Sequence, residues 1–402
     1  MLYVIMADGD GKRWNNYLNI PKHLAKINGE TLLGRTTRLL KENGITDYII
    51  TTRDDRYKQY GTIRPQTHRD CEVDRFEEFN EPVCYLYGDV YYTEDAMKTI
   101  VTTKTDNIQF FGSDYEIFAI KISNIKLFYE HKNNVKKLFL NNKIDRCIGW
   151  EVYRSLHNIP LHEHAITGDY TRVLDDTDDI DYPTDYDAVK ARIENETMLT
   201  AIIPCHDLEK WIKPCLNSLI NQDNNLRLQR EFIFICDNCK DKTHEVIENM
   251  FKNTKLDYTI VDANVCSPGY ARNIGLDKAK GKYIWFIDGD DWLTTNDAID
   301  VVLNCMIRDD MDIVEFKIKS KAHPDGKFGG GTVWRAMLSK RIIGGTRFNN
   351  RQNGEDNDFC DIVWKKPNVK YGKIDFAPYF YNFPREGSQS DIKYHTYKKE
   401  VA

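Results

Sequence analysis

The chain has 402 residues, of which 41% are hydrophobic and 29% are charged, and its formal net charge is −6 at pH 7. These values are ordinary for a globular protein and exclude a fibrous or largely disordered chain. The negative charge also excludes general attraction to nucleic acid. No apolar run approaches the roughly 18–20 residues that cross a bilayer, so we expect a cytoplasmic protein without membrane insertion.

The predicted elements of the first half begin with an apolar strand, Leu2–Met6, which runs into a glycine-rich turn. A helical pattern follows and ends at Gly44. Its apolar face comprises Leu32, Leu33, Leu39 and Leu40. Buried strands are predicted at Tyr48–Thr51 and Val83–Tyr87, and a short helix at about residues 186–194.

The second half repeats this order, with a strand at residues 199–203 and further buried strands at 232–236 and 283–287. The apolar face of its first predicted helix comprises Trp211, Cys215, Leu216, Leu219 and Ile220. Alternating strands and helices predict parallel or mixed sheets covered by helices. We therefore expect an α/β protein of two tandem Rossmann-like domains, each a mixed, mostly parallel sheet flanked by helices, at residues 1–196 and 197–402.

The ten cysteines include one pair at CxxC spacing, Cys236 and Cys239. We find no second pair, and no nearby histidine that would complete a four-ligand zinc site. Reduced thiols are therefore expected rather than disulfides or zinc.

An acidic turn, Asp288-Gly289-Asp290-Asp291, directly follows the predicted strand at 283–287. In open α/β sheets, ligands bind at the carboxyl ends of the strands. Two aspartates one residue apart can hold one hard divalent cation and leave positions for phosphate oxygens. Such a cation would neutralise a sugar-diphosphate leaving group. A polar turn without a ligand is the alternative when this motif is taken alone.

Further motifs surround this turn in a fixed order. They are Ile203-Pro204-Cys205-His206-Asp207, Ile235-Cys236-Asp237-Asn238-Cys239, Gly269-Tyr270-Ala271-Arg272-Asn273, Glu355-Asp356 and Tyr381-Asn382-Phe383-Pro384-Arg385. Together, over roughly residues 198–390, they resemble the inverting family 2 glycosyltransferases of the GT-A fold. The resemblance implies an enzyme that requires Mn²⁺ or Mg²⁺ and takes a sugar from a nucleotide-sugar donor.

The resemblance implies a donor site made by five residues. Pro204 and His206 would line the nucleotide pocket. Asp237 would accept a hydrogen bond from the donor base. Arg272 and Asn273 would flank the donor diphosphate and sugar.

The resemblance also implies a metal site and a catalytic pair. Asp288, Asp290 and Asp291 would hold the metal, and Asp288 would also contact the donor. Asp356 would be the catalytic base, paired with Glu355. An inverting transfer needs such a carboxylate to take the proton of the acceptor hydroxyl, on the face opposite the leaving group.

The glycine-rich turn of the first half, Ala7-Asp8-Gly9-Asp10-Gly11-Lys12-Arg13, has glycines two apart. Such spacing lets backbone N–H groups approach phosphates, which the neighbouring cations can neutralise. The segments that follow it include Pro21-Lys22-His23-Leu24, Gly88-Asp89 and Ile180-Asp181-Tyr182-Pro183. Over roughly residues 1–195 this series resembles the sugar-phosphate and molybdenum-cofactor type nucleotidyltransferases.

This second resemblance implies that the first domain makes a nucleotide sugar. The residues that would hold a nucleoside triphosphate are Gly9, Gly11, Lys12, Arg13 and Lys22. Lys22 would also stabilise charge on the α-phosphorus. Asp89 and Asp181 would hold the magnesium that assists attack by a sugar phosphate. Because Asp8 and Asp10 place carboxylates where a triphosphate would lie, a degenerate domain kept as a binding scaffold is the alternative.

Residues 313–351 contain nine basic and only two acidic side chains. The basic ones are Lys317, Lys319, Lys321, Lys327, Arg335, Lys340, Arg341, Arg347 and Arg351. With interleaved aromatic residues, they could contact a phosphate backbone and a flipped-out base. Family 2 domains occur in phage enzymes that add sugars to hydroxymethylated bases, so the sequence predicts modified DNA as the acceptor. A solvated surface, or contact with the donor diphosphate or an anionic lipid, is the alternative.

Three functions are therefore compatible with the sequence. The first is a bifunctional enzyme that makes a nucleotide sugar and transfers its sugar. The second is a transferase acting on a surface glycan or polymer, with a degenerate first domain. The third, a non-catalytic lectin-like or scaffolding protein, is disfavoured because Asp237, Asp288, Asp290 and Asp356 are all present.

Overall fold

The computed structural model of the chain describes residues 1–9, 11–65, 70–351 and 353–383. Asp10 and the end of the last sequence motif, from Pro384 onward, lie outside these residues. The chain divides into two compact units, Met1–Glu194 and Asn195–Ala402. In the described ranges, no helix is both long and apolar enough to cross a bilayer.

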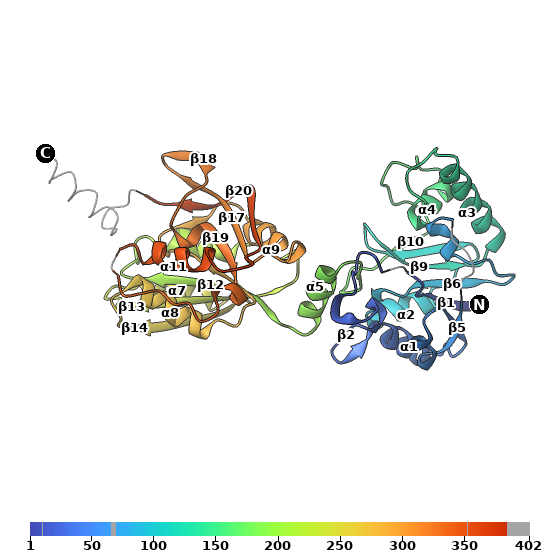
Figure 1. The fold of residues 1–402 in the computed structure, drawn as a ribbon, viewed down its shortest axis with the longest axis horizontal. Helices are drawn as coiled ribbons and strands as arrows, with labels where there is room; N and C mark the ends of the chain where they lie inside the picture. The colour runs from blue at the N-terminus through green and yellow to red at the C-terminus, as the bar shows by residue number, and fades with distance from the viewer. Residues whose placement is uncertain (10, 66–69, 352, 384–402) are drawn as a thin grey trace. The chain divides into compact units, whose positions relative to one another are not determined.

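The first unit is built on a seven-stranded sheet in the order β10-β8-β9-β6-β1-β4-β5 (Figure 1). These strands are β1 (Leu2–Met6), β4 (Tyr48–Thr51), β5 (Thr62–Arg64), β6 (Val83–Tyr87), β8 (Ile108–Gly112), β9 (Ile117–Ile122) and β10 (Tyr170–Arg172). Strand β1 pairs in parallel with β4 and β6, whereas β9 runs antiparallel to β6 and β8. Two short antiparallel ladders join β2 (Lys26–Ile27) to β3 (Glu30–Thr31) and β7 (Val90–Tyr91) to β11 (Asp178–Asp179).

Helices cover both faces of this sheet. Helices α1 (Leu32–Glu42) and α2 (Glu94–Thr102) pack on one face, and α3 (Ile125–Leu140) and α4 (Gly149–Leu156) on the other. The predicted leucine face of α1 is buried, and the helix begins where the Thr31 hydroxyl accepts the N–H of Gly34 at 3.0 Å. Such a cap satisfies one of the free N–H groups of the first turn.

The first unit ends with α5 (Pro183–Ile193), which begins at a proline, as first helical positions favour. Single-turn helices complete it, at η1 (Tyr17–Asn19), η2 (Lys22–Leu24), η3 (Asp55–Gln59) and η4 (Glu72–Arg75). The predicted strands and the first helix of this half are confirmed.

The second unit has a nine-stranded sheet in the order β14-β13-β12-β15-β19-β17-β20-β16, with β18 paired to β17. The strands are β12 (Thr197–Cys205), β13 (Gln229–Asp237), β14 (Asp257–Ala263), β15 (Tyr283–Phe286), β16 (Trp292–Leu293), β17 (Ile313–Ser320), β18 (His323–Lys327), β19 (Ala336–Ser339) and β20 (Tyr371–Tyr381). Strands β14, β13, β12 and β15 are parallel, and β19 then runs antiparallel to β15. The α/β class and the mixed sheets are therefore confirmed, but the second sheet is not mostly parallel as predicted, because its pairings β15–β19, β17–β19, β16–β20 and β17–β18 are antiparallel.

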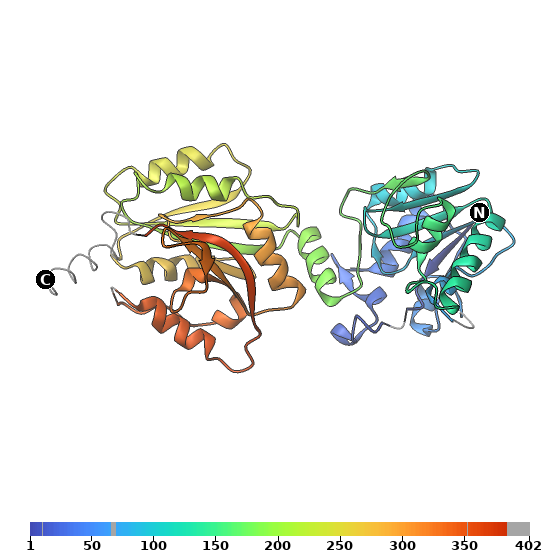
Figure 2. The same ribbon diagram turned by 90° about the horizontal axis from the view of Figure 1, so that it is seen from above.

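Helices also cover both faces of the second sheet. Figure 2 shows α6 (Lys213–Ile220) and α7 (Thr243–Phe251) on one face and α8 (Pro268–Lys278) and α11 (Glu355–Trp364) on the other. The remaining helices are α9 (Ala298–Arg308), α10 (Lys340–Ile343) and the single turn η5 (Val333–Arg335). The predicted helix at 211–220 begins only at Lys213, because Pro214 occupies its first turn.

A close approach of α8 to the sheet positions the residues described below. A Cβ atom at Gly275 would lie 2.4 Å from Cγ2 of Ile202 on β12. Only glycine therefore lets α8 lie this close to β12. The helix presents Arg272, one turn earlier, to the carboxyl ends of the parallel strands.

Candidate active site

A cavity of about 630 Å³ lies at the carboxyl ends of the parallel strands of the second unit. The turns after β12 and β13, helix α8, the acidic turn after β15 and the start of α11 all contribute to its lining. Eight residues predicted from the sequence line it: Pro204, His206, Asp237, Arg272, Asp288, Asp290, Glu355 and Asp356. Asn273 and Asp291 do not.

Arg272 connects three carboxylates across this cavity. Its side chain is 4% exposed. One terminal nitrogen, Nη1, donates to Oε1 of Glu355 at 3.1 Å and to Oδ1 of Asp356 at 2.9 Å. The other, Nη2, donates to Oδ1 of Asp288 at 2.8 Å. A single buried cation thus holds the acidic turn and the start of α11 in one arrangement.

Asp356 has the environment of a general base. Burial raises its pKa to about 6, the nearby Asp288 and Glu355 carboxylates act in the same direction, and Arg272 opposes them. Asp356 is the second residue of α11, and Gly354 caps the start of this helix at the cavity. The φ of Gly354 is +87°, a conformation that suits glycine. A carboxylate with a pKa near 6 is ionised at neutral pH and basic enough to accept a proton from a hydroxyl group as that group reacts.

The three aspartates of the acidic turn divide into two groups. Asp288 and Asp290 line the cavity. Asp291 is 1% exposed and accepts hydrogen bonds from the Tyr379 hydroxyl at 2.7 Å and the Asn382 N–H at 2.8 Å. Burial and the other two carboxylates raise the pKa of Asp291 well above its usual value. Asp291 therefore anchors the turn to β20. Contrary to the prediction, it does not face the cavity.

The residues that face the cavity suit a hard divalent cation. Asp288 and Asp290 offer oxygen ligands from one side, and the cavity beside them leaves room for phosphate oxygens. This is the donor set that magnesium and manganese accept when a substrate supplies the remaining ligands.

Asp237 has its carboxylate engaged by the backbone. Oδ1 accepts the N–H groups of Val265 and Cys266 at 2.8 and 3.0 Å, and Oδ2 accepts that of Ser267 at 2.9 Å. These bonds fix the loop that leads into α8, close to the cavity. Asp237 thus holds this loop and also lines the cavity, and its contact with a donor base stays a prediction.

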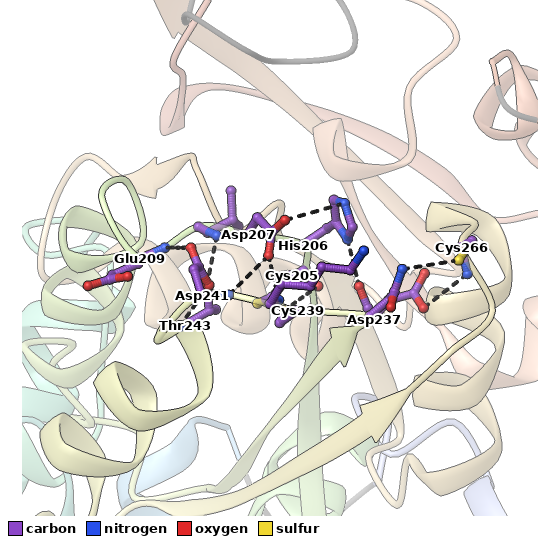
Figure 3. Close-up of polar contacts among 12 residues, drawn as sticks. Cys205, His206, Asp207, Glu209, Asp237, Cys239, Asp241, Thr243 and Cys266 are labelled. Carbon is purple, nitrogen blue, oxygen red and sulfur yellow. Dashed lines mark hydrogen bonds and ion pairs between the residues drawn. The ribbon is translucent and has the colours of Figure 1, made fainter.

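His206 and Asn273 differ in their relation to the cavity. The His206 side chain lies at its edge, and Nδ1 contacts the carbonyl oxygen of Asp237 at 2.7 Å (Figure 3). The Asn273 amide instead donates to the carbonyl of Phe348 and accepts its N–H, both at 2.9 Å. Asn273 therefore holds the 348 region against α8 and does not line the cavity, and its contact with the donor stays a prediction.

Aromatic side chains form a stack along one wall of the cavity, which the sequence reasoning did not assign. Trp334 stacks on Tyr381 with ring centroids 5.0 Å apart, and Tyr381 stacks on Phe383 at 5.6 Å. All three line the cavity. Tyr379 also stacks on Trp334, with ring centroids 5.2 Å apart. The aromatic run Tyr379-Phe380-Tyr381, followed by Phe383, is the signal in the sequence that could have revealed this wall, since every second residue of a strand faces the same side.

The first unit has a cavity of about 620 Å³ beside its glycine-rich turn. Gly9, Gly11 and Lys22 line it as predicted, but Asp8 lines it too and pairs with Arg53 at 3.3 Å. Lys12 does not line it. The predicted triphosphate site therefore includes a carboxylate, as the alternative of a scaffold domain anticipates.

The predicted magnesium ligands of the first unit lie together with one that was missed. Asp89, Asp179 and Asp181 offer carboxylate oxygens within 4.8 Å of one another. Lys22 Nζ lies 2.5 Å from Asp89 and 3.2 Å from Asp181. Arg13 pairs with Asp181 instead of facing the larger cavity. The three carboxylates and Arg13 line a second, smaller cavity of about 200 Å³.

Two of these carboxylates have opposite pKa shifts. Burial raises the pKa of Asp179 well above its usual value, and Asp89 adds to the effect. Burial acts on Asp89 as well, but Lys22 and Arg75 hold its pKa below the usual range. The cluster thus combines an ionised carboxylate with one that favours its proton unless a cation is present.

Residues 200–361 match the family described as Glycosyl transferase family 2. The second unit carries a family 2 glycosyltransferase domain. Both the matched range and the cavity residues fall in this unit, so the predicted family resemblance of the second half is confirmed.

The family 2 domain is similar to several bacterial proteins. An uncharacterized glycosyltransferase of Haemophilus influenzae is 36% identical over 118 residues, which cover 28% of this chain and 44% of that protein. The poly(ribitol-phosphate) beta-N-acetylglucosaminyltransferase TarS of Staphylococcus aureus is 26% identical over 147 residues, covering 36% and 25%. The chain therefore spans less than half the length of these relatives. The crystal structure of TarS 1–349 with UDP-GlcNAc has a TM-score of 0.44 and 21% identity, covering 48% of this chain and 61% of that one.

The basic stretch of the family 2 domain is largely ion-paired or hydrogen-bonded. At least six of its nine cations have such partners: Lys317 with Asp375, Arg335 with Glu315, Lys340 with the Ala279 carbonyl, Arg341 with Asp312, Arg347 with Asp277 and Arg351 with Asp358. Arg335 is itself 9% exposed. The basic excess therefore does not translate into a matching set of unpaired surface cations, and modified DNA as the acceptor stays a prediction.

Proposed function

We propose that the second unit is a metal-dependent inverting glycosyltransferase that uses a nucleotide-sugar donor. The observation that carries the proposal is the Arg272 network. It brings the Asp356 carboxylate and the acidic turn into one cavity at the carboxyl ends of the parallel strands. The family 2 match over residues 200–361 supports it independently.

In this proposal the donor occupies the cavity with its diphosphate at the acidic turn. Asp288 and Asp290 would hold Mn²⁺ or Mg²⁺, which when bound neutralises the leaving diphosphate. Arg272 keeps the Asp288 carboxylate oriented through its hydrogen bond at 2.8 Å. Asp291 holds the turn itself against β20, through Tyr379.

Asp356 would act on the acceptor. Its carboxylate takes the proton of the acceptor hydroxyl as that oxygen attacks the anomeric carbon, and the nucleoside diphosphate leaves from the opposite face. A pKa of about 6 leaves Asp356 ionised at neutral pH. Glu355 shares the same arginine nitrogen and helps to fix the start of α11.

We propose a surface glycan or polyol-phosphate polymer as the acceptor. The relatives that are named as poly(ribitol-phosphate) glycosyltransferases support this class, at 26% and 32% identity. The aromatic wall of Trp334, Tyr381 and Phe383 supports it too, since flat aromatic faces pack well against the apolar faces of sugar rings. Modified DNA remains an outcome that the following test can detect.

Mass spectrometry of the products tests both donor and acceptor. The full chain is incubated with Mn²⁺ and a panel of nucleotide sugars, together with a teichoic-type polymer, a glycan mixture, or DNA with and without hydroxymethylated bases. The proposal expects one added sugar mass on the polymer or glycan. A sugar on hydroxymethylated DNA alone would overturn the proposed acceptor class, and no transfer to any acceptor would contradict the proposal itself.

A second proposal concerns the first unit, which we propose to be a nucleotidyltransferase acting on a nucleoside triphosphate and a sugar phosphate. The specific observation in its favour is the cluster of Asp89, Asp179 and Asp181 beside Lys22. Three carboxylates with a buried lysine suit a magnesium ion and a triphosphate. A scaffold domain without catalysis is the competing function, and pyrophosphate release separates the two, as set out in the Discussion.

A further inference from the structure

Two cysteines lie at the end of β13, Cys236 within the strand and Cys239 just after it, and the fold brings a histidine and an aspartate to Cys236. Cys236 is the register partner of Asp262 on the neighbouring strand β14, so both side chains leave the sheet side by side. Helix α7 begins at Thr243 and carries His244 back over the same point. The Cys236 sulfur, a ring nitrogen of His244 and a carboxylate oxygen of Asp262 lie within 4.8 Å of one another.

Cys239 lies beside this group of three, next to Cys236. Its thiol shares a hydrogen bond with that of Cys236, which is 2% exposed. From the sequence, no histidine was expected near enough to complete the CxxC pair. The structure corrects this, because His244 lies five residues after Cys239 in the chain and reaches Cys236 where the turn runs into α7.

The turn that carries these groups is already fixed by hydrogen bonds (Figure 3). Oδ1 of Asp207 accepts the N–H of Lys240 at 2.7 Å, and Oδ2 of Asp241 accepts the N–H of Glu209 at 2.8 Å. The other oxygen of Asp241 accepts the N–H of Thr243 at 2.9 Å. Cys239 and His244 therefore leave from a rigid frame, and little ordering is needed for both to bind one ion.

We propose that Cys236, Cys239, His244 and Asp262 form a binding site for one Zn²⁺. Two sulfurs, one imidazole nitrogen and one carboxylate oxygen are ligands that zinc accepts in a tetrahedral site. From the usual zinc–ligand bond lengths, the ligand atoms of such a site lie about 3.3–3.8 Å apart. Three of the four ligand atoms already lie within 4.8 Å of one another, and the Cys239 sulfur, hydrogen-bonded to that of Cys236, would turn toward them by side-chain rotation.

Charge and orientation agree with a zinc site. His244 Nδ1 already contacts Oδ1 of Asp262 at 2.8 Å, so the imidazole is held at the position where it would bind. Two thiolates and a carboxylate would exceed the charge of the dication by one. Lys240 and Lys242, both exposed on the same turn, can offset that remainder.

The site adjoins the donor cavity but uses different residues and different chemistry. Asp237 and Asn238, which lie between the two cysteines in sequence, both line the cavity. Zinc would thus fix that edge of the cavity in place. Thiolate and imidazole ligands select a soft or borderline ion, whereas the Asp288 turn offers only oxygen. The inference rests on the cluster and not on the proposed transferase activity.

Metal titration of the full chain tests this inference. The reduced protein is stripped with a chelator and titrated with Zn²⁺ against a chromogenic competitor, and then with Co²⁺ as a spectroscopic probe. We expect one Zn²⁺ per chain and thiolate-to-cobalt charge-transfer absorption. Cys239→Ser and His244→Gln should each weaken zinc binding by at least about tenfold, since loss of even an outer partner commonly has that effect. Cys266→Ser, close by but outside the cluster, should leave the affinity unchanged.

The controls keep the result independent of folding and of catalysis. Circular dichroism establishes that each variant is folded, and the buried Cys236 is left intact for that reason. Asp290→Ala should bind zinc like the wild type even where sugar transfer is lost, so failure of the proposed function would not imitate failure of the zinc site. Absence of stoichiometric zinc, unchanged affinity in both folded ligand variants, or a cobalt complex without thiolate absorption would overturn the inference.

Discussion

Arg272 donates a hydrogen bond to Asp356 at 2.9 Å while its other terminal nitrogen holds the acidic turn. The same guanidinium therefore contacts the carboxylate proposed to activate the acceptor and the one proposed to hold the metal. Burial leaves Arg272 4% exposed, so these contacts are poorly screened by solvent. The proposed base, Asp356, and the proposed metal ligand, Asp288, are therefore coupled through one side chain.

Arg272→Lys should raise the pKa of Asp356 and slow transfer. A lysine ammonium cannot reproduce the planar fork whose two terminal nitrogens reach three carboxylates, and Arg272 is the larger of the influences that lower the pKa of Asp356. The base acts when ionised, so activity falls as pH drops through the pKa, and a higher pKa moves that loss toward neutral pH. We expect the acidic limb of the pH profile of kcat/KM to move upward and the rate near neutral pH to fall by at least about tenfold. Arg347→Lys, whose partner Asp277 is exposed, is the control, and matching profiles for wild type and Arg272→Lys would contradict the coupling.

Asp356→Asn should remove the base while keeping its shape. We expect transfer to fall by roughly 10²–10⁴-fold, the range for a positioned general base, with donor affinity within a few-fold of wild type. Steady-state kinetics and equilibrium binding of the donor measure the two effects. Asp358→Asn, on the same helix but paired with Arg351 at the surface, should transfer normally. Normal transfer by Asp356→Asn would show that another group takes the proton.

Asp290→Ala and Asp291→Ala should fail in different ways. Loss of Asp290 removes a proposed metal ligand, so donor cleavage should disappear as it does in excess chelator. Loss of Asp291 leaves the Tyr379 hydroxyl and the Asn382 N–H without their acceptor, which should lower the free energy of unfolding by about 1–3 kcal/mol. Urea unfolding and the Mn²⁺ dependence of donor cleavage separate the two. Equal loss of stability in both variants would argue against this division.

Much of the fold follows from local pattern. The apolar run of β1 and the leucine face of α1 predicted both elements at their observed positions, because burial on one face sets the periodicity. The edge that carries the site was also predictable, since the carboxyl ends of parallel strands meet at one side of a sheet. The location of the acidic turn follows from this rule, whereas Asp356 reaches the site from the start of α11.

The orientation of single side chains was not predictable from the same patterns. Nothing in the sequence of the acidic turn shows that Asp291 points away from the cavity, because its partner Tyr379 lies 88 residues further on. The carboxylate of Asp237 is engaged by a loop that only the packing of α8 brings near. Arg272 could be assigned to the site, but its bridging role depends on the register of α8 against α11.

Lys22→Ala tests the first unit. If this unit is a nucleotidyltransferase, a nucleoside triphosphate and a suitable sugar phosphate should release pyrophosphate. The variant should lose that release, because Lys22 is the cation next to Asp89 and Asp181. Transfer from a supplied nucleotide sugar should be unchanged, and Lys26→Ala, an exposed lysine nearby, should behave like the wild type. No pyrophosphate from a broad panel of sugar phosphates would favour a scaffold domain.

Cleavage of a nucleotide sugar by the full chain is the most direct test of the proposed transferase. The measurement is the release of nucleoside diphosphate from a panel of nucleotide sugars with Mn²⁺ or Mg²⁺, for wild type and Asp290→Ala side by side. The proposal predicts release from at least one donor, faster with acceptor present, and none with excess chelator or from Asp290→Ala. Folded wild-type protein that leaves every nucleotide sugar intact, or an Asp290→Ala variant as active as wild type, would contradict it.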